Sequence, residues 1–73
     1  MWSRWDVPLK VGEMIKLLES DGWYLVRVRG SHRHYRHPGK PGTATVAGKP
    51  SDTLPPGTER SILRQAGIQR RSQ

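Results

Sequence analysis

The chain has 73 residues, with 13 lysines and arginines against 6 aspartates and glutamates, and its net charge at pH 7 is +7. A chain of this length forms one small domain, so we do not expect a deep enclosed active site, and any chemistry has to take place on a surface. The absence of cysteine excludes both disulfides and thiolate zinc sites.

The positive charge is uneven along the chain and favours a polyanionic partner, either nucleic acid or an acidic protein surface. Residues 1–31 have a net charge of +1, whereas residues 32–73 have a net charge of +6. The alternative is a small protein that is basic without a specific polyanionic partner. The sequence shows neither a membrane-spanning apolar run nor a secretory signal, so we expect a cytoplasmic protein without a membrane partner.

The chain begins with a segment that has little to bury and continues into a helix. We expect residues 1–9 to form an extension, in which Trp2 and Trp5 have no assigned role. The sequence VGEMIKLLESDGW then carries apolar residues at helical spacing, with charged residues between them. This pattern predicts an amphipathic helix over about residues 10–21, ended by Gly22.

The next segment has the pattern of strands. WYLVRVR is aromatic and β-branched, HRHYRH alternates, and the Gly-Ser between them suits a two-residue type II′ turn, so residues 23–37 predict a β-hairpin. PGKPG then predicts a turn, and TATVA, residues 43–47, predicts a short third strand.

A loop rich in proline and glycine leads into a second predicted helix, TERSILRQAGI, with Thr58 as its N-cap and Gly67 as its stop. Residues 69–73 are expected to form a tail, which leaves residues 10–68 as the domain. The order α-β-β-β-α predicts an α+β fold in which both helices cover one face of a three-stranded antiparallel sheet.

The two-residue turn sorts the hairpin side chains into two faces, because side chains alternate along a strand. The face expected to pack on the helices carries Tyr24, Val26, Val28 and Tyr35. The other face, open to solvent, is expected to carry Arg27, Arg29, His32, His34 and Arg36, with Leu25 and Trp23 towards its far end. One more residue in the turn would exchange the faces of one strand relative to the other.

The stretch RVRGSHRHYRH contains four arginines and three histidines and no carboxylate. Arginines bind phosphate, and histidine is a base that RNA cleavage can use, because the 2′-OH of RNA is an internal nucleophile. His32 and His34 would stand about 6.5 Å apart along the strand, a separation that lets them flank one phosphate. One alternative is that the histidines are solvated surface residues. The other is a metal site, but the neighbouring cations disfavour it, and His37 faces away from the other two histidines.

The segment that begins MIKLLESDGW resembles the HicA (YcfA-like) toxins of bacterial toxin-antitoxin pairs over roughly residues 10–68. The shared features are the helix followed by DGW, the RGSH turn, HP after the second strand, and the ending LPPGTERSILRQAG. The resemblance implies a double-stranded-RNA-binding-domain-like fold and a metal-independent mRNA interferase that a HicB antitoxin covers and inactivates. It also implies that the catalytic histidine is His32, with Gly30 and Ser31 forming the turn of the motif.

We therefore expect an endoribonuclease toxin with no cofactor or metal, monomeric when free, with His32 in the general acid/base role. His34 is assigned as a helper from strand geometry alone. The residues expected to bind RNA are Arg27, Arg29, Ser31, Arg36, Lys40 and Lys49. Two rivals remain: a non-catalytic RNA-binding module, and an adaptor whose basic face holds an acidic partner.

Overall fold

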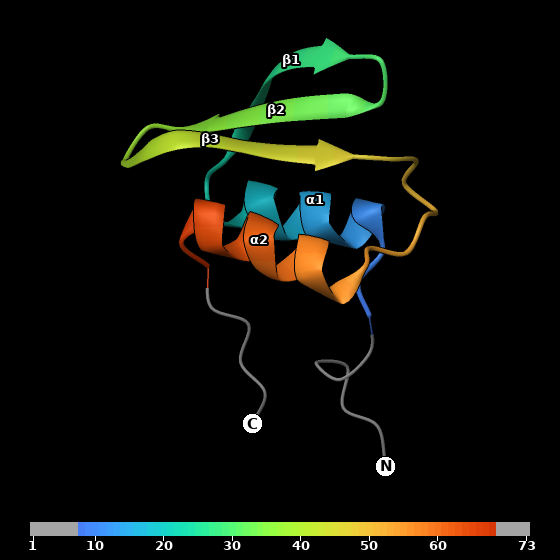
Figure 1. Cartoon of the computed structure of the whole chain (residues 1–73). Coiled ribbons are helices and arrows are strands. Elements are labelled where there is room, and N and C mark those ends of the chain that lie inside the picture. Colours follow the sequence, from blue (N-terminus) through green and yellow to red (C-terminus); the bar gives the residue numbers. More distant parts are fainter. Residues whose placement is uncertain (1–7, 69–73) are drawn as a thin grey trace.

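The computed structural model describes residues 8–68, which form two helices and one three-stranded antiparallel sheet (Figure 1). In chain order the elements are α1 (Val11–Ser20), β1 (Tyr24–Arg29), β2 (His32–His37), β3 (Lys40–Ala47) and α2 (Pro56–Ala66). The strand order is β1-β2-β3, and both helices lie on one side of the sheet (Figure 1). The predicted element order and the α+β fold of the double-stranded-RNA-binding type are confirmed.

Some sequence-based expectations fall on parts of the chain that the structure leaves undescribed. Trp2 and Trp5 lie outside the described residues, as does the tail at residues 69–73. Neither of the two helices within residues 8–68 has the length and apolar character needed to span a bilayer.

The N-terminus of α1 is capped by the loop that connects β3 to α2. The N–H of Val11 donates to the carbonyl of Asp52 at 2.9 Å, and the N–H of Gly12 donates to the carbonyl of Pro50 at 3.0 Å. The Glu13 carboxylate accepts the N–H of Lys10 at 2.8 Å. These contacts supply acceptors for N–H groups that a helix start otherwise leaves unpaired, and they fix the loop to the helix.

The second helix begins earlier than predicted. It starts at Pro56 after an N-cap at Pro55, so the assignment of Thr58 as N-cap is wrong. Proline is favoured at the first helical position, where its missing N–H has no partner to lose. The predicted stop is confirmed, because Gly67 follows the helix in the left-handed conformation with φ of +64°.

The hydrophobic core lies between the helices and the face of the sheet that they cover. Its buried apolar residues are Val11, Met14, Leu18, Trp23, Tyr35, Ala44, Val46, Leu54, Ile62, Leu63 and Ala66. The third strand is longer than predicted, since it starts at Lys40 and the turn before it shrinks to residues 38–39. β2 pairs with β3 from His32 opposite Ala47, and the pairing is irregular between Tyr35 and His37.

The first strand departs most from the prediction, because its pairing with β2 shifts at Val26. Arg29 opposes His32 and Arg27 opposes His34 as expected, but beyond the irregularity Leu25 opposes Tyr35. An extra residue in one strand exchanges the faces of the residues that precede it.

The expectation that Tyr24, Val26 and Val28 pack on the helices is therefore wrong: their exposed fractions are 51%, 51% and 57%. Tyr24 lies on the solvent-facing side of the sheet, opposite Arg36. Val28 lies on the helix side, but it stays exposed because β1 is the strand farthest from the helices (Figure 1). The expectation that Trp23 and Leu25 lie on the solvent-facing side is also wrong. Trp23 fills the core with 2% of its surface exposed, and Leu25 opposes Tyr35 on the helix side.

Candidate functional site

The side of the sheet turned away from the helices, called here the open face, carries side chains in rows across the strands. Strand pairing places opposite residues on the same face. One row holds Arg29, His32 and Ala47, the next holds Arg27, His34 and Thr45, and the last holds Tyr24 and Arg36. The predicted grouping of Arg27, Arg29, His32, His34 and Arg36 on one face agrees with this register.

His32 occupies the first position of β2, directly after the hairpin turn, and its side chain is exposed. Gly30 has φ of +60°, and no non-glycine residue among those described has a positive φ. A positive φ at the first turn residue with a negative φ at the second fits type II′ and excludes type I′. Gly30 and Ser31 thus set the point at which His32 enters the sheet.

His34 is half-buried and held by its neighbour on β3. Its Nδ1 lies 3.0 Å from the Thr45 hydroxyl oxygen, so the ring is fixed across the sheet. Along β2 it follows His32 by two positions, which corresponds to about 6.5 Å. The two histidines therefore stand on the same face in adjacent rows of the sheet.

The charged side chains of the open face are all positive. Arg27, Arg29 and Arg36 are all exposed there, and none of the three strands contains an aspartate or glutamate. Without carboxylates in the sheet to pair with, the guanidinium groups are available to anions from solution. The face has the character of a phosphate-binding surface.

Two further residues expected to contact RNA lie at the turn end of the sheet. Ser31 is exposed in the turn, and its carbonyl accepts the N–H of Gly48 at 3.2 Å. Lys49 follows Gly48 directly and is exposed. The structure therefore brings Lys49 to the same end of the sheet as His32.

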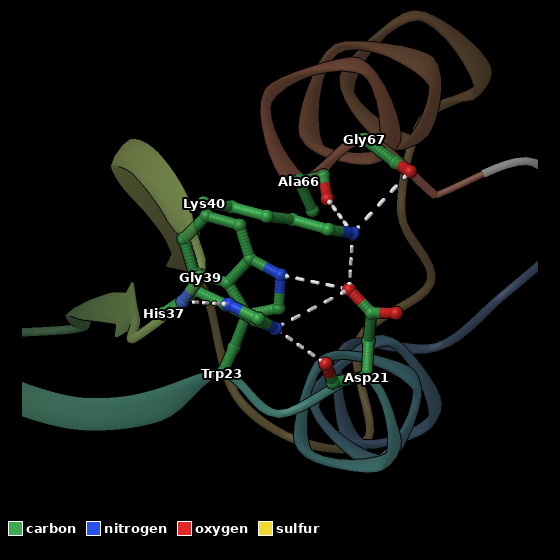
Figure 2. A network of polar contacts seen from close by, with 7 residues as sticks. All are labelled: Asp21, Trp23, His37, Gly39, Lys40, Ala66 and Gly67. Carbon is green, nitrogen blue, oxygen red and sulfur yellow. Dashed lines mark hydrogen bonds and ion pairs between the residues drawn. The ribbon is translucent and has the colours of Figure 1, made fainter.

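Lys40 lies in a different place, at the opposite end of β3, where it joins both helices (Figure 2). Its Nζ donates to Asp21 Oδ2 at 2.5 Å and to the carbonyl of Ala66 at 3.0 Å, and the carbonyl of Gly67 is 3.5 Å away. A lysine at the end of a helix satisfies carbonyls that have no partner within the helix. Its RNA-binding role stays a prediction, and we leave Lys40 out of the proposed RNA surface.

His37 belongs to the same network and not to the open face. The N–H of Gly39 donates to its Nδ1 at 2.9 Å, so the ring proton is on Nε2, which donates to the carbonyl of Asp21 at 2.6 Å. The ring also contacts Trp23 edge to face, with centroids 5.3 Å apart. This histidine connects the sheet to the end of α1.

Asp21 is the common acceptor of the network. Besides Lys40, it accepts the indole N–H of Trp23 at 3.2 Å, and its Oδ2 lies 4.0 Å from His37 Nε2. The hydrogen bond from Lys40 is the main reason that the pKa of Asp21 lies below its ordinary value of 3.8, and desolvation opposes part of that shift.

Sequence reasoning missed two residues of the open face. Tyr24 was placed on the helix side because a shift of pairing at Val26 leaves no mark in the residue pattern. Thr45 was expected only as part of a strand, since its position opposite His34 depends on the pairing of β2 with β3. An exposed tyrosine beside Arg36 offers an aromatic surface on which a base can stack.

Comparison with known protein families gives a match over residues 11–68 to the family described as the HicA toxin of bacterial toxin-antitoxin systems. The chain belongs to the HicA toxin family. HicA membership makes it the toxin component of such a system and implies an antitoxin partner. A search of curated proteins finds no significant match to this HicA chain.

Proposed function

We propose that this HicA toxin is an endoribonuclease that cuts mRNA on the open face, with His32 in the general acid/base role. The observation that carries the proposal is the position of His32: exposed, directly after the Gly-Ser turn, and opposite Arg29 in a sheet without carboxylates. A phosphate held by the arginines lies within reach of this imidazole.

The chemistry needs only groups that the face and the substrate supply. His32 accepts the proton of the 2′-OH while O2′ forms its bond to phosphorus, and the bond from phosphorus to the 5′-oxygen breaks. The products are a 2′,3′-cyclic phosphate and a 5′-OH. The leaving oxygen takes a proton from His34 in its protonated form or from water, and a proton taken by His32 returns to solvent.

The arginines bind the substrate and stabilise charge. Arg27 and Arg29 lie beside the two histidines in the strand pairing, where a guanidinium group can contact the phosphate that reacts. Donors placed around the equatorial oxygens stabilise the negative charge of the pentacoordinate transition state. Arg36, Ser31 and Lys49 extend the RNA contacts in both directions from this point.

Metal independence is part of the proposal. The open face offers no carboxylate oxygens, which are the protein ligands that magnesium prefers, and its arginines repel cations. With a nucleophile inside the substrate and a histidine base, the reaction needs no metal-bound hydroxide. Cleavage in the presence of EDTA is therefore expected.

The proposal extends to partner and place. HicA membership implies an antitoxin, and we propose that it covers the open face and so withholds the arginines from RNA. A target of mRNA places the toxin in the cytoplasm, and we propose that the free toxin is a monomer.

The test is cleavage of a mixed-sequence single-stranded RNA, with EDTA present, by the parent chain and by His32→Ala. Loss of general acid/base catalysis slows cleavage by about 100-fold or more. Because His32 is exposed, we expect the variant to stay folded, with its free energy of unfolding changed by less than about 0.5 kcal/mol. Circular dichroism and RNA affinity are measured alongside.

The two alternative functions predict different results in this cleavage experiment. A non-catalytic RNA-binding module binds RNA through the same arginines but leaves the RNA intact in both proteins. An adaptor for an acidic protein shows neither cleavage nor salt-dependent RNA binding. Cleavage by His32→Ala at the parent rate would remove His32 from the mechanism.

A further inference from the structure

The outer edge of β1 is the part of the molecule that the proposed RNA chemistry leaves unused. β1 is the first strand of the order β1-β2-β3, so one side of its backbone has no partner strand among residues 8–68. In Figure 1 it lies on the side of the sheet farthest from both helices. A free edge of six residues is long enough to accept another strand.

The helix-side surface of this strand is apolar and uncovered. Leu25 and Val28 oppose Tyr35 and Arg33, two residues of the covered side of β2, yet their exposed fractions are 49% and 57%. Next to them Val26 is 51% exposed. Exposed apolar side chains gathered along one strand mark a site of interaction with another molecule.

We propose that the edge of β1 binds an extended segment of a protein partner in which acidic and apolar residues alternate. A strand added beside β1 continues the sheet, so its side chains point alternately to the same two sides. On the open face they meet Arg27 and Arg29, which call for carboxylates. On the helix side they meet Leu25 and Val28, which call for apolar side chains.

Charge argues against a second copy of this chain as the occupant. An antiparallel pair of β1 strands would bring Arg27 and Arg29 of one copy against the same arginines of the other, and each chain carries a net charge of +7. Like charges opposite one another destabilise strand pairing. RNA matches the arginines, but it offers no apolar counterpart to Leu25 and Val28.

Occupation of this edge also has a consequence for the open face, and this step rests on the proposed function. Acidic side chains of the added strand would stand over Arg27 and Arg29, the groups proposed to hold phosphate. The same segment that gains main-chain hydrogen bonds from β1 would compete with RNA. Docking itself does not depend on RNA cleavage.

The test uses a ten-residue peptide in which glutamate and valine alternate, added to the full chain labelled with ¹⁵N. The readout is amide hydrogen exchange. At a peptide concentration about ten times its Kd, the outward-facing amides of β1 should exchange about tenfold more slowly, because binding protects only the bound form. A peptide of the same composition, with all glutamates before all valines, is the matched control and should protect them far less.

The variant Leu25→Gln/Val28→Thr keeps the net charge and removes the apolar surface. Both side chains are about half exposed, so we expect the variant to fold and to cut RNA at the parent rate, but to lose most of the protection. Protection by the alternating peptide alone, weakened in the variant, supports the proposal.

The proposal is overturned if the β1 amides are unprotected, if both peptides protect equally, or if protection falls on β3. It is also overturned if RNA protects β1 and the variant weakens RNA binding. Intact cleavage without docking refutes this inference alone, whereas docking without cleavage refutes only the proposed ribonuclease.

Discussion

The three histidines of β2 are the same residue type in one strand, yet their positions give them different roles. His32 is exposed on the open face, and His34 shares that face with its ring held by Thr45. His37 is on the opposite side, with both ring nitrogens occupied by main-chain groups. Alternation along the strand, read from the sequence, already separated His37 from the other two.

Gly22 makes the position of His37 possible. Its φ is +104°, and a Cβ built on it would lie 2.8 Å from His37 Nε2. We expect Gly22→Ala to lower the free energy of unfolding by about 1–3 kcal/mol, because both the backbone conformation and the contact are unfavourable. Urea unfolding measures this change.

Gly57→Ala is the matched control for that substitution. Gly57 lies in α2, and a Cβ there meets nothing within 4 Å. Alanine in a helix is favoured over glycine by about 0.5–1 kcal/mol, so this variant should be at least as stable as the parent. Equal losses in the two variants would contradict the role given to Gly22.

At the scale of elements, Asp21 and Lys40 connect the sheet to the ends of both helices. The pKa of Asp21 is lowered, so its charged form is stabilised by folding. This gain in stability is complete above pH 3.8, the ordinary pKa of the group. It is lost as the pH falls through the lower pKa of the folded state. Acid therefore weakens this connection, and neutral pH preserves it.

Asp21→Asn should flatten the fall in stability below pH 3.8, the ordinary pKa of this group. Both side chains of the Asp21–Lys40 ion pair are about one third exposed, so solvent weakens their attraction. Loss of the pair at neutral pH should therefore lower the free energy of unfolding by about 1 kcal/mol or less. Urea unfolding from neutral to acidic pH measures both effects, with Lys40→Met as the second arm. An unchanged acid dependence in Asp21→Asn would show that other groups cause it.

The elements and the basic face could be predicted from the sequence, but the far half of β1 could not. Helical spacing, the Gly-Ser turn and strand alternation are local patterns, and they gave α1, the hairpin and the placing of His32 with His34. The irregularity at Val26 depends on packing between strands, so Tyr24, Leu25 and Trp23 were predicted on the wrong sides. The bonds of Lys40 join segments far apart in the chain, which no local pattern contains.

At the scale of the whole molecule, the separation of charge from core explains how so small a chain can present a basic surface that carries two histidines. The helices bury one side of β2 and β3, and the other side needs no apolar residues, so it can carry arginines and histidines. Such a face should bind RNA mainly through charge.

The salt dependence of RNA affinity tests whether charge dominates RNA binding. If Arg27, Arg29, Arg36 and Lys49 each neutralise one phosphate, log K for single-stranded RNA should fall with log salt with a slope of about −3. Arg29→Gln should reduce the magnitude of the slope by about 0.7, since one phosphate contact is lost. Arg60→Gln, which removes an exposed arginine of α2, is the control and should leave the slope near the parent value. A parent slope near zero would contradict binding by the open face.

The proposed ribonuclease chemistry can be checked from the ends left when the parent chain cuts RNA in the presence of EDTA. Attack by the 2′-OH, with His32 as base, predicts a 2′,3′-cyclic phosphate on one fragment and a 5′-OH on the other, both formed about 100-fold or more slowly by His32→Ala. Fragments that carry a 3′-OH and a 5′-phosphate, or RNA that stays intact while bound, would contradict the account.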